Sequence, residues 1–205
     1  MEIFLVRHPP VHTKGSHCYG SSDVPLIPEW QKGARAALSL LPESGDAQVW
    51  TSPLGRCTQM ADLYESQAPR DARLREMDFG SWENRLWRAI PRAEVDAWVA
   101  DIVAYRPPDG ESFFEVIERV REFWGDRLRP ESAQPVVIFT HAGVIKALLA
   151  VLAGLAPHIA ARFQLDYNSV TKIGVARDWA RVDFVNRVGL SPGGDLGPLP
   201  RPPSK

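Results

Sequence analysis

The sequence lacks the features that mark secreted and membrane-bound proteins. Its 205 residues include two cysteines, Cys18 and Cys57, which cannot build a disulfide framework and so favour a reducing compartment. The first apolar run, residues 3–6, is far too short for a signal peptide, and no stretch approaches the length of a membrane span. We therefore expect a cytoplasmic protein that does not contact a membrane.

An excess of charge of either sign is also missing. The formal net charge is -1, so no overall field attracts the chain to nucleic acid or anionic lipid. Any affinity for an anion must come from a local cluster of cations. No G-x-G-x-x-G motif follows the first apolar run, which argues against a dinucleotide-binding oxidoreductase. The expected partner is a small molecule, and the sequence does not indicate an oligomeric state.

Short apolar runs predict the strands of a buried sheet. Three of them have the continuous apolar character of strands covered on both faces: residues 3–6, 48–50 and 136–139. Two more strands are predicted at residues 170–175 and 182–188, joined as a hairpin around Asp178.

Helical patterns separate these strands. Ser52 and Pro53 predict the N-cap and first turn of a helix that runs to about residue 65, and Ser112 with Glu115 predicts a capping box. Apolar periodicity predicts the remaining helices, at residues 34–41, 85–104 with an interruption at Pro91, and 144–155. Strands that alternate with helices predict an α/β fold, a three-layer α/β/α sandwich around a mostly parallel sheet.

The chain is long enough for one domain with a small addition. We assign residues 1–190 to a single domain with a helical cap around residues 80–110. Residues 191–205 are mostly proline, glycine and charged residues, and we predict a disordered tail there.

Polar side chains follow three predicted strands at the points where those strands end. Arg7 and His8 follow the first strand, and His141 follows the third. Ser52 follows the second strand, with Arg56 one helical turn further on. Because ligands of such sheets bind beyond the carboxyl ends of the strands, we expect these side chains to meet at one edge.

The expected cluster suits a compact dianion such as phosphate. Arginine matches phosphate oxygens in a bidentate manner, and the helix that begins near Ser52 adds free N–H groups. His8 is the candidate nucleophile, because imidazole is largely neutral near pH 7. Glu76 is the candidate proton donor, because a carboxyl group beside bound phosphate has a raised pKa.

Each of these residues also has an ordinary structural interpretation. Arg7 can be a salt-bridged strand end, Arg56 a solvated charge, and His141 a hydrogen-bonded residue at the start of a helix. Their joint appearance at successive strand ends favours a functional site instead. The two histidines and Glu76 can also suggest zinc, but two nearby arginines would repel a metal ion. We therefore expect no metal and no cofactor.

Four segments, in order along the chain, match motifs of one known superfamily. They are Leu5-Val6-Arg7-His8, Thr51-Ser52-Pro53-Leu54-Gly55-Arg56-Cys57, Leu74-Arg75-Glu76-Met77-Asp78-Phe79-Gly80-Ser81-Trp82-Glu83 and Thr140-His141-Ala142-Gly143. With these segments the chain resembles the histidine phosphatase, or phosphoglycerate-mutase-like, superfamily. The resemblance implies the fold of that superfamily and phosphorylation of His8. It also implies a phosphate pocket of Arg7, Arg56 and His141, with Glu76 as the proton donor.

Within the superfamily the chain is most similar to the α-ribazole phosphatase branch of cobalamin synthesis. The residues that carry this similarity are Cys18-Tyr19-Gly20, Asp23-Val24-Pro25-Leu26 and Gly110-Glu111-Ser112. The chain departs from the family pattern at Pro9 and Pro10, where glycine and then glutamate or glutamine are usual. Proline has no N–H, so this loop cannot donate those two backbone hydrogen bonds to phosphate.

The function predicted from these observations is metal-independent hydrolysis of a phosphomonoester through a phosphohistidine on His8. An α-ribazole 5′-phosphate substrate is the specific candidate. Two alternatives stay open: a phosphoglycerate mutase-type transfer of the phosphoryl group back to substrate, and a phosphate-binding module without turnover.

Overall fold

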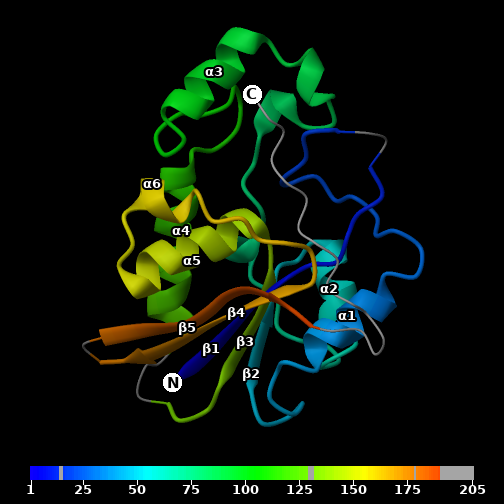
Figure 1. Cartoon of the computed structure of the whole chain (residues 1–205), viewed down its shortest axis with the longest axis vertical. Helices are drawn as coiled ribbons and strands as arrows, with labels where there is room; N and C mark the ends of the chain where they lie inside the picture. The colour runs from blue at the N-terminus through cyan, green and yellow to red at the C-terminus, as the bar shows by residue number, and fades with distance from the viewer. Residues whose placement is uncertain (14–15, 129–131, 178, 190–205) are drawn as a thin grey trace, which may run out of the picture.

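The computed structural model describes residues 1–13, 16–128, 132–177 and 179–189 (Figure 1). Within these residues five strands form one sheet with the order β2-β3-β1-β4-β5. The strands are β1 (Glu2–Arg7), β2 (Gln48–Thr51), β3 (Val136–Thr140), β4 (Ser169–Ala176) and β5 (Trp179–Val188). β2, β3 and β1 pair in parallel, whereas β4 is antiparallel to both of its neighbours. All the strands except β4 share one direction, which confirms a mostly parallel sheet.

Helices cover both faces of this sheet. The described helices are α1 (Gln31–Leu38), α2 (Gly55–Ala61), α3 (Arg92–Ala100), α4 (Phe113–Arg127), α5 (Ala142–Ala153) and α6 (Pro157–Ala160). Short 3-10 helices lie at Ala72–Leu74, Gly80–Trp82 and Trp87–Ala89. α4 and α5 pack on one face of the sheet, and α1 and α2 pack on the other (Figure 1). The three-layer α/β/α arrangement is therefore confirmed.

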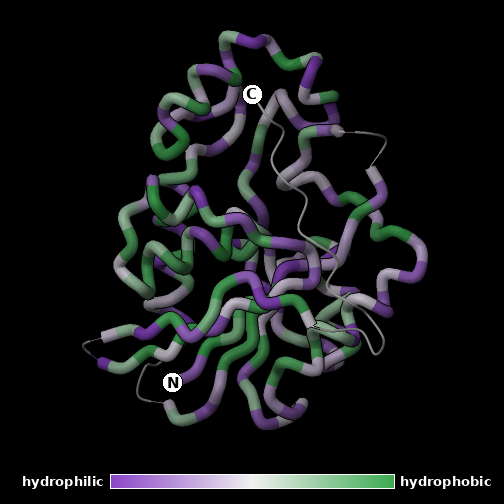
Figure 2. Tube along the Cα trace, in the orientation of Figure 1, coloured by the Kyte–Doolittle hydropathy of each residue, from purple (hydrophilic) through white to green (hydrophobic). Residues whose placement is uncertain are grey.

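β1 shows why the central strands are apolar at consecutive positions. Successive side chains of a strand point to opposite faces. Ile3 and Leu5 pack in the core under α4 and α5, whereas Phe4 and Val6 pack in the core under α1 and α2. A strand covered on both faces needs an apolar side chain at every position. Figure 2 shows this as hydrophobic colouring along the central strands.

The helix predicted from Ser52 to about residue 65 is wrong at both ends. α2 spans Gly55–Ala61, and its N-cap is Leu54 without a side-chain cap. Ser52 stays extended because its N–H donates to the Phe139 carbonyl at 2.9 Å and so continues the pairing of β2 with β3. The first helical N–H, on Gly55, donates instead to Asp23 at 2.9 Å. The Gly55 N–H, one of the donors expected to be free at the start of this helix, is thus already occupied.

The other helices agree with the predictions to different degrees. The capping box is confirmed, since Ser112 accepts from the Glu115 N–H while Glu115 accepts from the Ser112 N–H. The helix predicted at residues 85–104 is correct only over α3, because Trp87–Ala89 forms a 3-10 turn and α3 spans Arg92–Ala100. Asp178 and the predicted tail at residues 191–205 lie outside the described residues.

The segment at residues 80–110 contains α3 and two of the 3-10 helices, and it lies at the top of Figure 1. It packs around its own aromatic cluster, in which the Trp87 and Trp98 rings stack with centroids 5.8 Å apart and Trp82 is fully buried. This cluster is separate from the two cores that flank the sheet. In the described part of the chain, no helix has both the length and the apolar character that a membrane crossing requires.

Candidate active site

The predicted polar residues come together at the carboxyl edge of the sheet. In the parallel sheet Arg7 pairs with Thr140, and Thr51 pairs with Phe139, so the ends of β1, β2 and β3 lie side by side. The His8 and His141 rings are 5.1 Å apart between centroids, at an interplanar angle of 61°. Both imidazoles are almost completely buried.

His8 is held as a neutral imidazole with one nitrogen free. Its Nδ1 lies 2.7 Å from the Pro9 carbonyl oxygen, which can only accept a hydrogen bond, so Nδ1 carries the proton. Burial lowers the pKa of His8 well below its usual value, and the positive charges of Arg56 and Arg7 lower it further. The unprotonated Nε2 is therefore available to attack an electrophile.

His141 has the opposite tautomer. Its Nδ1 accepts a hydrogen bond from Arg56 Nε at 3.3 Å, and because arginine can only donate, the ring proton lies on Nε2. Nε2 in turn lies 2.8 Å from the Ser52 hydroxyl oxygen. Burial lowers the pKa of His141 well below its usual value, and Arg56 adds to the effect. His141 is thus a neutral hydrogen-bond donor in the cluster.

Arg56 is completely buried, and backbone carbonyls fix its guanidinium plane. Nη1 donates to the Ser22 carbonyl at 2.7 Å, and Nη2 donates to the Gly20 carbonyl at 2.5 Å. With Nε bound to His141, each Nη atom keeps one N–H, and these two can form a fork for an anion.

Glu83 fixes the loop whose carbonyl groups bind Arg56. Its carboxylate accepts hydrogen bonds from the N–H groups of Ser21 and Ser22, both at 2.7 Å, and from Phe79 at 3.1 Å. Burial raises the pKa of Glu83, but these hydrogen bonds outweigh burial and keep the pKa below its ordinary value. Glu83 is therefore an ionised anchor that orients the carbonyls around Arg56.

Arg7 lies on the other side of His8. It donates through Nη1 to the Leu165 carbonyl, and its guanidinium lies 3.9 Å above the centre of the Tyr167 ring. Its Nε is buried and has no hydrogen-bond partner among the described residues. A buried donor without a partner is costly in the free protein and suits an incoming anion.

Sequence reasoning missed the two tyrosines of this site. The Tyr19 and Tyr167 hydroxyls share a hydrogen bond of 2.5 Å, and the Tyr167 ring lies 5.5 Å from the His8 ring. Tyr167 precedes β4, and because β4 is antiparallel to β1, its beginning lies at the edge where β1 ends. An inspection of strand ends alone overlooks such a residue. The polar residues at 166–168, directly before the strand predicted at residues 170–175, were the feature of the sequence that could have indicated Tyr167.

Glu76 is fixed beside the turn that carries His141. Its Oε2 accepts from the Gly143 N–H at 3.2 Å, and its Oε1 accepts from the Met77 N–H at 3.0 Å. A Cβ atom at position 143 would lie 2.3 Å from Glu76 Oε1, so this close approach requires glycine.

Glu76 lines two cavities of different character. One has a volume of about 200 Å³ and is bordered mainly by apolar side chains. The other, of about 300 Å³, is bordered mainly by charged side chains, among them Arg75 and Arg119. The arrangement therefore offers a carboxyl group between two possible sites for the rest of a substrate.

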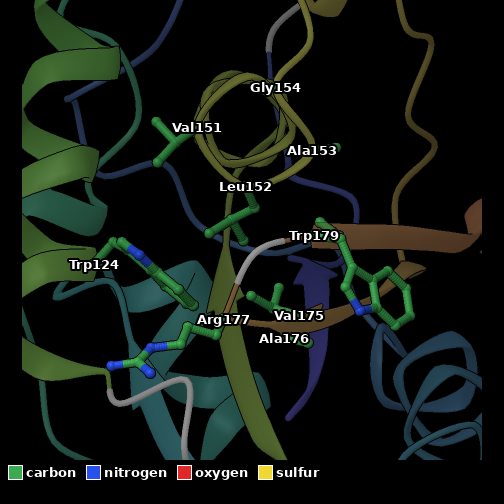
Figure 3. A pocket seen from close by; sticks show the side chains of 10 residues that line it. Trp124, Val151, Leu152, Ala153, Gly154, Val175, Ala176, Arg177 and Trp179 are labelled. Carbon is green, nitrogen blue, oxygen red and sulfur yellow. The ribbon is translucent and has the colours of Figure 1, made fainter.

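A larger cavity lies elsewhere, at the turn between β4 and β5. It has a volume of about 420 Å³ and is bordered by Trp124 of α4, the last residues of α5 and Trp179 (Figure 3). Arg177 is the one titratable side chain among its lining residues. The size of a cavity therefore does not identify the active site of this protein.

Among the described residues, no group of three histidine, cysteine or acidic side chains is placed to hold a metal ion.

Comparisons with known proteins agree with this geometry. The chain matches the Histidine phosphatase superfamily (branch 1) over residues 3–188. It is 29% identical to the Yersinia enterocolitica protein named "Probable phosphoglycerate mutase GpmB", covering 84% of each chain. The crystal structure of the α-ribazole phosphatase from Shigella flexneri is similar with a TM-score of 0.80 and 28% identity, covering 93% of this chain and 99% of that one.

A second similar structure is the mycobacterial glucosyl-3-phosphoglycerate phosphatase. Its TM-score is 0.73 at 25% identity, and the likeness covers 90% of this chain and 98% of that one. The relatives thus carry different named activities on one fold. With the family match extending over almost all the described residues, the chain belongs to the histidine phosphatase superfamily, branch 1.

Proposed function

We propose that this protein hydrolyses phosphomonoesters through a phosphohistidine intermediate on His8. The single observation that carries the proposal is the state of His8, a buried neutral imidazole. Its Nδ1 proton is bound to Pro9 and its Nε2 is free. A nucleophile normally needs activation by a neighbouring base, but a neutral imidazole nitrogen already has its lone pair.

In the first step, His8 Nε2 forms a bond to phosphorus while the bond from phosphorus to the ester oxygen breaks. Glu76 in its protonated form donates the proton that the leaving oxygen needs. The positive charge that develops on His8 is stabilised by the Nδ1–H bond to the Pro9 carbonyl. Pro9 has no N–H to donate to phosphate, but its carbonyl group therefore stabilises the charged form of His8.

The non-bridging oxygens of the phosphoryl group meet a preorganised set of donors. The free N–H groups of Arg56 and the unpartnered Nε of Arg7 are positioned before the substrate arrives, and His141 acts through the Ser52 hydroxyl. The Ser52 hydroxyl, which accepts from His141, keeps its own proton for a phosphate oxygen. Such donors stabilise the charge that spreads over these oxygens in the transition state.

In the second step, water attacks phosphorus and the bond to His8 Nε2 breaks. Glu76, now a carboxylate, takes the proton from that water and returns to its acid form. The products are inorganic phosphate and an unmodified neutral His8, so the cycle is balanced.

Quenching in alkaline detergent, which preserves a P–N bond, tests the proposed intermediate. Enzyme mixed with labelled substrate and quenched should carry phosphate in a form stable to base and labile to acid, as a P–N bond requires. His8→Ala should lose both the label and nearly all turnover, whereas Ser52→Ala should keep the label. A base-labile label that disappears in Ser52→Ala would move the nucleophile to the serine.

For the substrate itself, we favour α-ribazole 5′-phosphate, supported by the structural likeness to the Shigella enzyme. The likeness to the Yersinia protein supports phosphoglycerate mutase-type transfer as a second candidate. Assays with α-ribazole 5′-phosphate, and with 3-phosphoglycerate plus a bisphosphorylated primer, separate the two. Phosphate binding without turnover of any ester would point to a binding module.

Two features bear on where and how this activity operates. Both cysteines are free and buried, which suits the reducing cytoplasm that we propose as the location of the protein.

We also propose that the domain spans residues 1–190, and that the segment at residues 80–110 serves as a cap over the leaving group.

A further inference from the structure

The leaving group must extend from Glu76 into one of the two cavities that this residue borders. This follows from the proposed function, because the acid that protonates the ester oxygen must touch it. The charged cavity and the apolar cavity would select different substrates. Their contacts show which of them is free to accept a ligand.

Two charged side chains that border the larger cavity, Arg119 and Glu111, already form an ion pair. Arg119 donates to Glu111 at 2.7 and 3.1 Å and also to the Arg73 carbonyl. Glu111 in addition accepts from the Asp78 N–H at 2.9 Å. A substrate anion there would have to compete with a partly buried ion pair, whose separation is costly.

The smaller cavity is built to hold an apolar ring. Phe79 and Trp98 form two of its walls, with ring centroids 6.0 Å apart and planes at 82°. Met77, Ile102 and Phe113 complete the apolar lining. The volume of about 200 Å³ is below the usual range for drug-sized ligands and suits one small ring system.

One cation lies in this apolar lining. Lys146 is on α5, one helical turn after Gly143, and both residues border the cavity. The Lys146 ammonium donates to the Ala161 carbonyl at 2.9 Å, which uses one of its three donors. Burial lowers the pKa of Lys146, although the negative charge of Glu76 opposes the effect. A partly buried ammonium with spare donors favours a hydrogen-bond acceptor on the ligand.

We propose that the substrate is a phosphomonoester of an aromatic alcohol whose ring occupies this cavity and offers an acceptor atom to Lys146. The proposal rests on the proposed function for the position of the ester oxygen. It assigns specificity to Lys146 and to the cap residues Phe79, Trp98 and Ile102. The cavity excludes small polar leaving groups because they would leave its apolar walls without contact.

A matched set of three esters tests the proposal. Pyridylethyl phosphate has the ring and the acceptor, phenethyl phosphate has the ring alone, and glycerol phosphate has neither. For the unmodified protein we expect kcat/KM to fall in that order, by about 10-fold at each step. Loss of the acceptor removes one hydrogen bond to a charged group, and loss of the ring removes the burial of a few apolar carbon groups. Equal values for the three esters would overturn the proposal.

Two variants separate the ring site from the acceptor site. Ile102→Trp fills the cavity and should raise KM for both aromatic esters by about 10-fold or more, and by less for glycerol phosphate, which makes few contacts with the apolar walls. Val99→Trp is the control, because Val99 lies on the same segment with 65% of its surface exposed. Aromatic esters that tolerate Ile102→Trp as well as Val99→Trp would place the leaving group elsewhere.

Lys146→Met keeps the length of the side chain and removes its donors. We expect the roughly 10-fold preference for pyridylethyl over phenethyl phosphate to disappear through KM, with the pH profile unchanged. An equal loss of kcat on all three esters with a shifted pH profile would show that Lys146 acts through Glu76, and would refute its role in specificity.

Binding measurements keep this inference separate from the proposed function. The phosphonate analogues of the same esters cannot be hydrolysed, and calorimetric titration reports their affinity without turnover. Affinity that depends on Ile102 and Lys146 would support the cavity even if no ester were hydrolysed and no label formed on His8. Affinity that is the same in all variants would overturn the inference even if the label forms.

Discussion

The two sides of the site are built in different ways. On the phosphate side, His8, Arg56 and His141 follow adjacent parallel strands, and each has its orientation fixed by hydrogen bonds to groups of the protein. On the leaving-group side, the cavity beside Glu76 is formed by side chains of the segment after residue 76 and of α5, with few polar contacts.

This difference indicates which side of the site can change without loss of chemistry. The charged groups depend on the sheet, whose register is set by the hydrophobic core on both faces. The apolar cavity depends on loop residues such as Phe79 and Ile102 and on Trp98 of α3, a helix in which no residue is fully buried. Substitutions on the phosphate side should affect every substrate, and those on the other side should affect only some.

The largest loss of rate is expected for Glu76→Gln, because Glu76 borders the leaving-group cavity and also contacts the turn that carries His141. The amide keeps the shape but cannot donate a proton to an alkoxide, so alkyl phosphates should lose about 100- to 10,000-fold in rate. Nitrophenolate leaves without a proton, so p-nitrophenyl phosphate should give a burst followed by slow turnover. Pre-steady-state release of nitrophenol measures this. Equal losses on both substrates without a burst would leave Glu76 only a structural role.

Arg56→Lys tests the phosphate side alone. Lysine keeps the charge but cannot contact Ser22, Gly20 and phosphate in one plane. We expect kcat/KM to fall at least about 10-fold, or about 1.4 kcal/mol, for every ester. Arg75→Lys is the control, since this exposed arginine lies outside the cluster around His8. A substrate-selective loss in Arg56→Lys would break the division between the two sides.

Gly143→Ala tests the contact that joins the two sides. Its new Cβ would lie 2.3 Å from Glu76 Oε1, so the carboxyl group must move. We expect about a 10-fold loss on alkyl phosphates, and a smaller loss on p-nitrophenyl phosphate, because misplacement weakens proton transfer. Gly125→Ala is the matched helical control, with no atom within 4 Å of the added Cβ. Similar kinetics for both alanine variants would contradict the assigned position of Glu76.

The smallest expected effect is on stability against pH. His8 and His141 have lowered pKa values in the folded state, so between those values and about 6.5 the unfolded chain binds more protons. The free energy of unfolding should therefore be constant above about pH 6.5 and fall below it, by up to about 1.4 kcal/mol per pH unit for each histidine. Chemical denaturation between pH 7 and 5 measures this slope. His8→Gln should make it shallower, and an unchanged slope would mean that His8 is already charged in the folded protein.

Several features of the site could be predicted from the sequence because they depend on local rules. Apolar runs identify strands buried on both faces, and the residues directly after parallel strands meet at one edge. Arg7, His8 and His141 were placed in this way, and the structure brings them together. Ser112 and Glu115 formed the predicted capping box, since that motif involves residues only three positions apart.

Other features needed the tertiary structure. The start of α2 depends on Asp23, a residue of a distant loop that binds the Gly55 N–H in place of Ser52. Tyr167 reaches the site because β4 is antiparallel, and strand direction is a property of the assembled sheet.

The sequence by itself thus determined that Arg7, His8 and His141, to which we assign roles in phosphoryl transfer, meet at one edge of the sheet, because each lies at the end of a strand whose apolar pattern is local. Only the tertiary structure decided where the cavity that we propose for the leaving group lies. This cavity joins Phe79, Trp98 and Phe113 to Lys146 of α5, and no periodicity relates residues so far apart in the chain. Their meeting is set by the packing of Phe79, Ile102 and Val103 against the core formed with α4 and α5, which is a sum of many small apolar contacts.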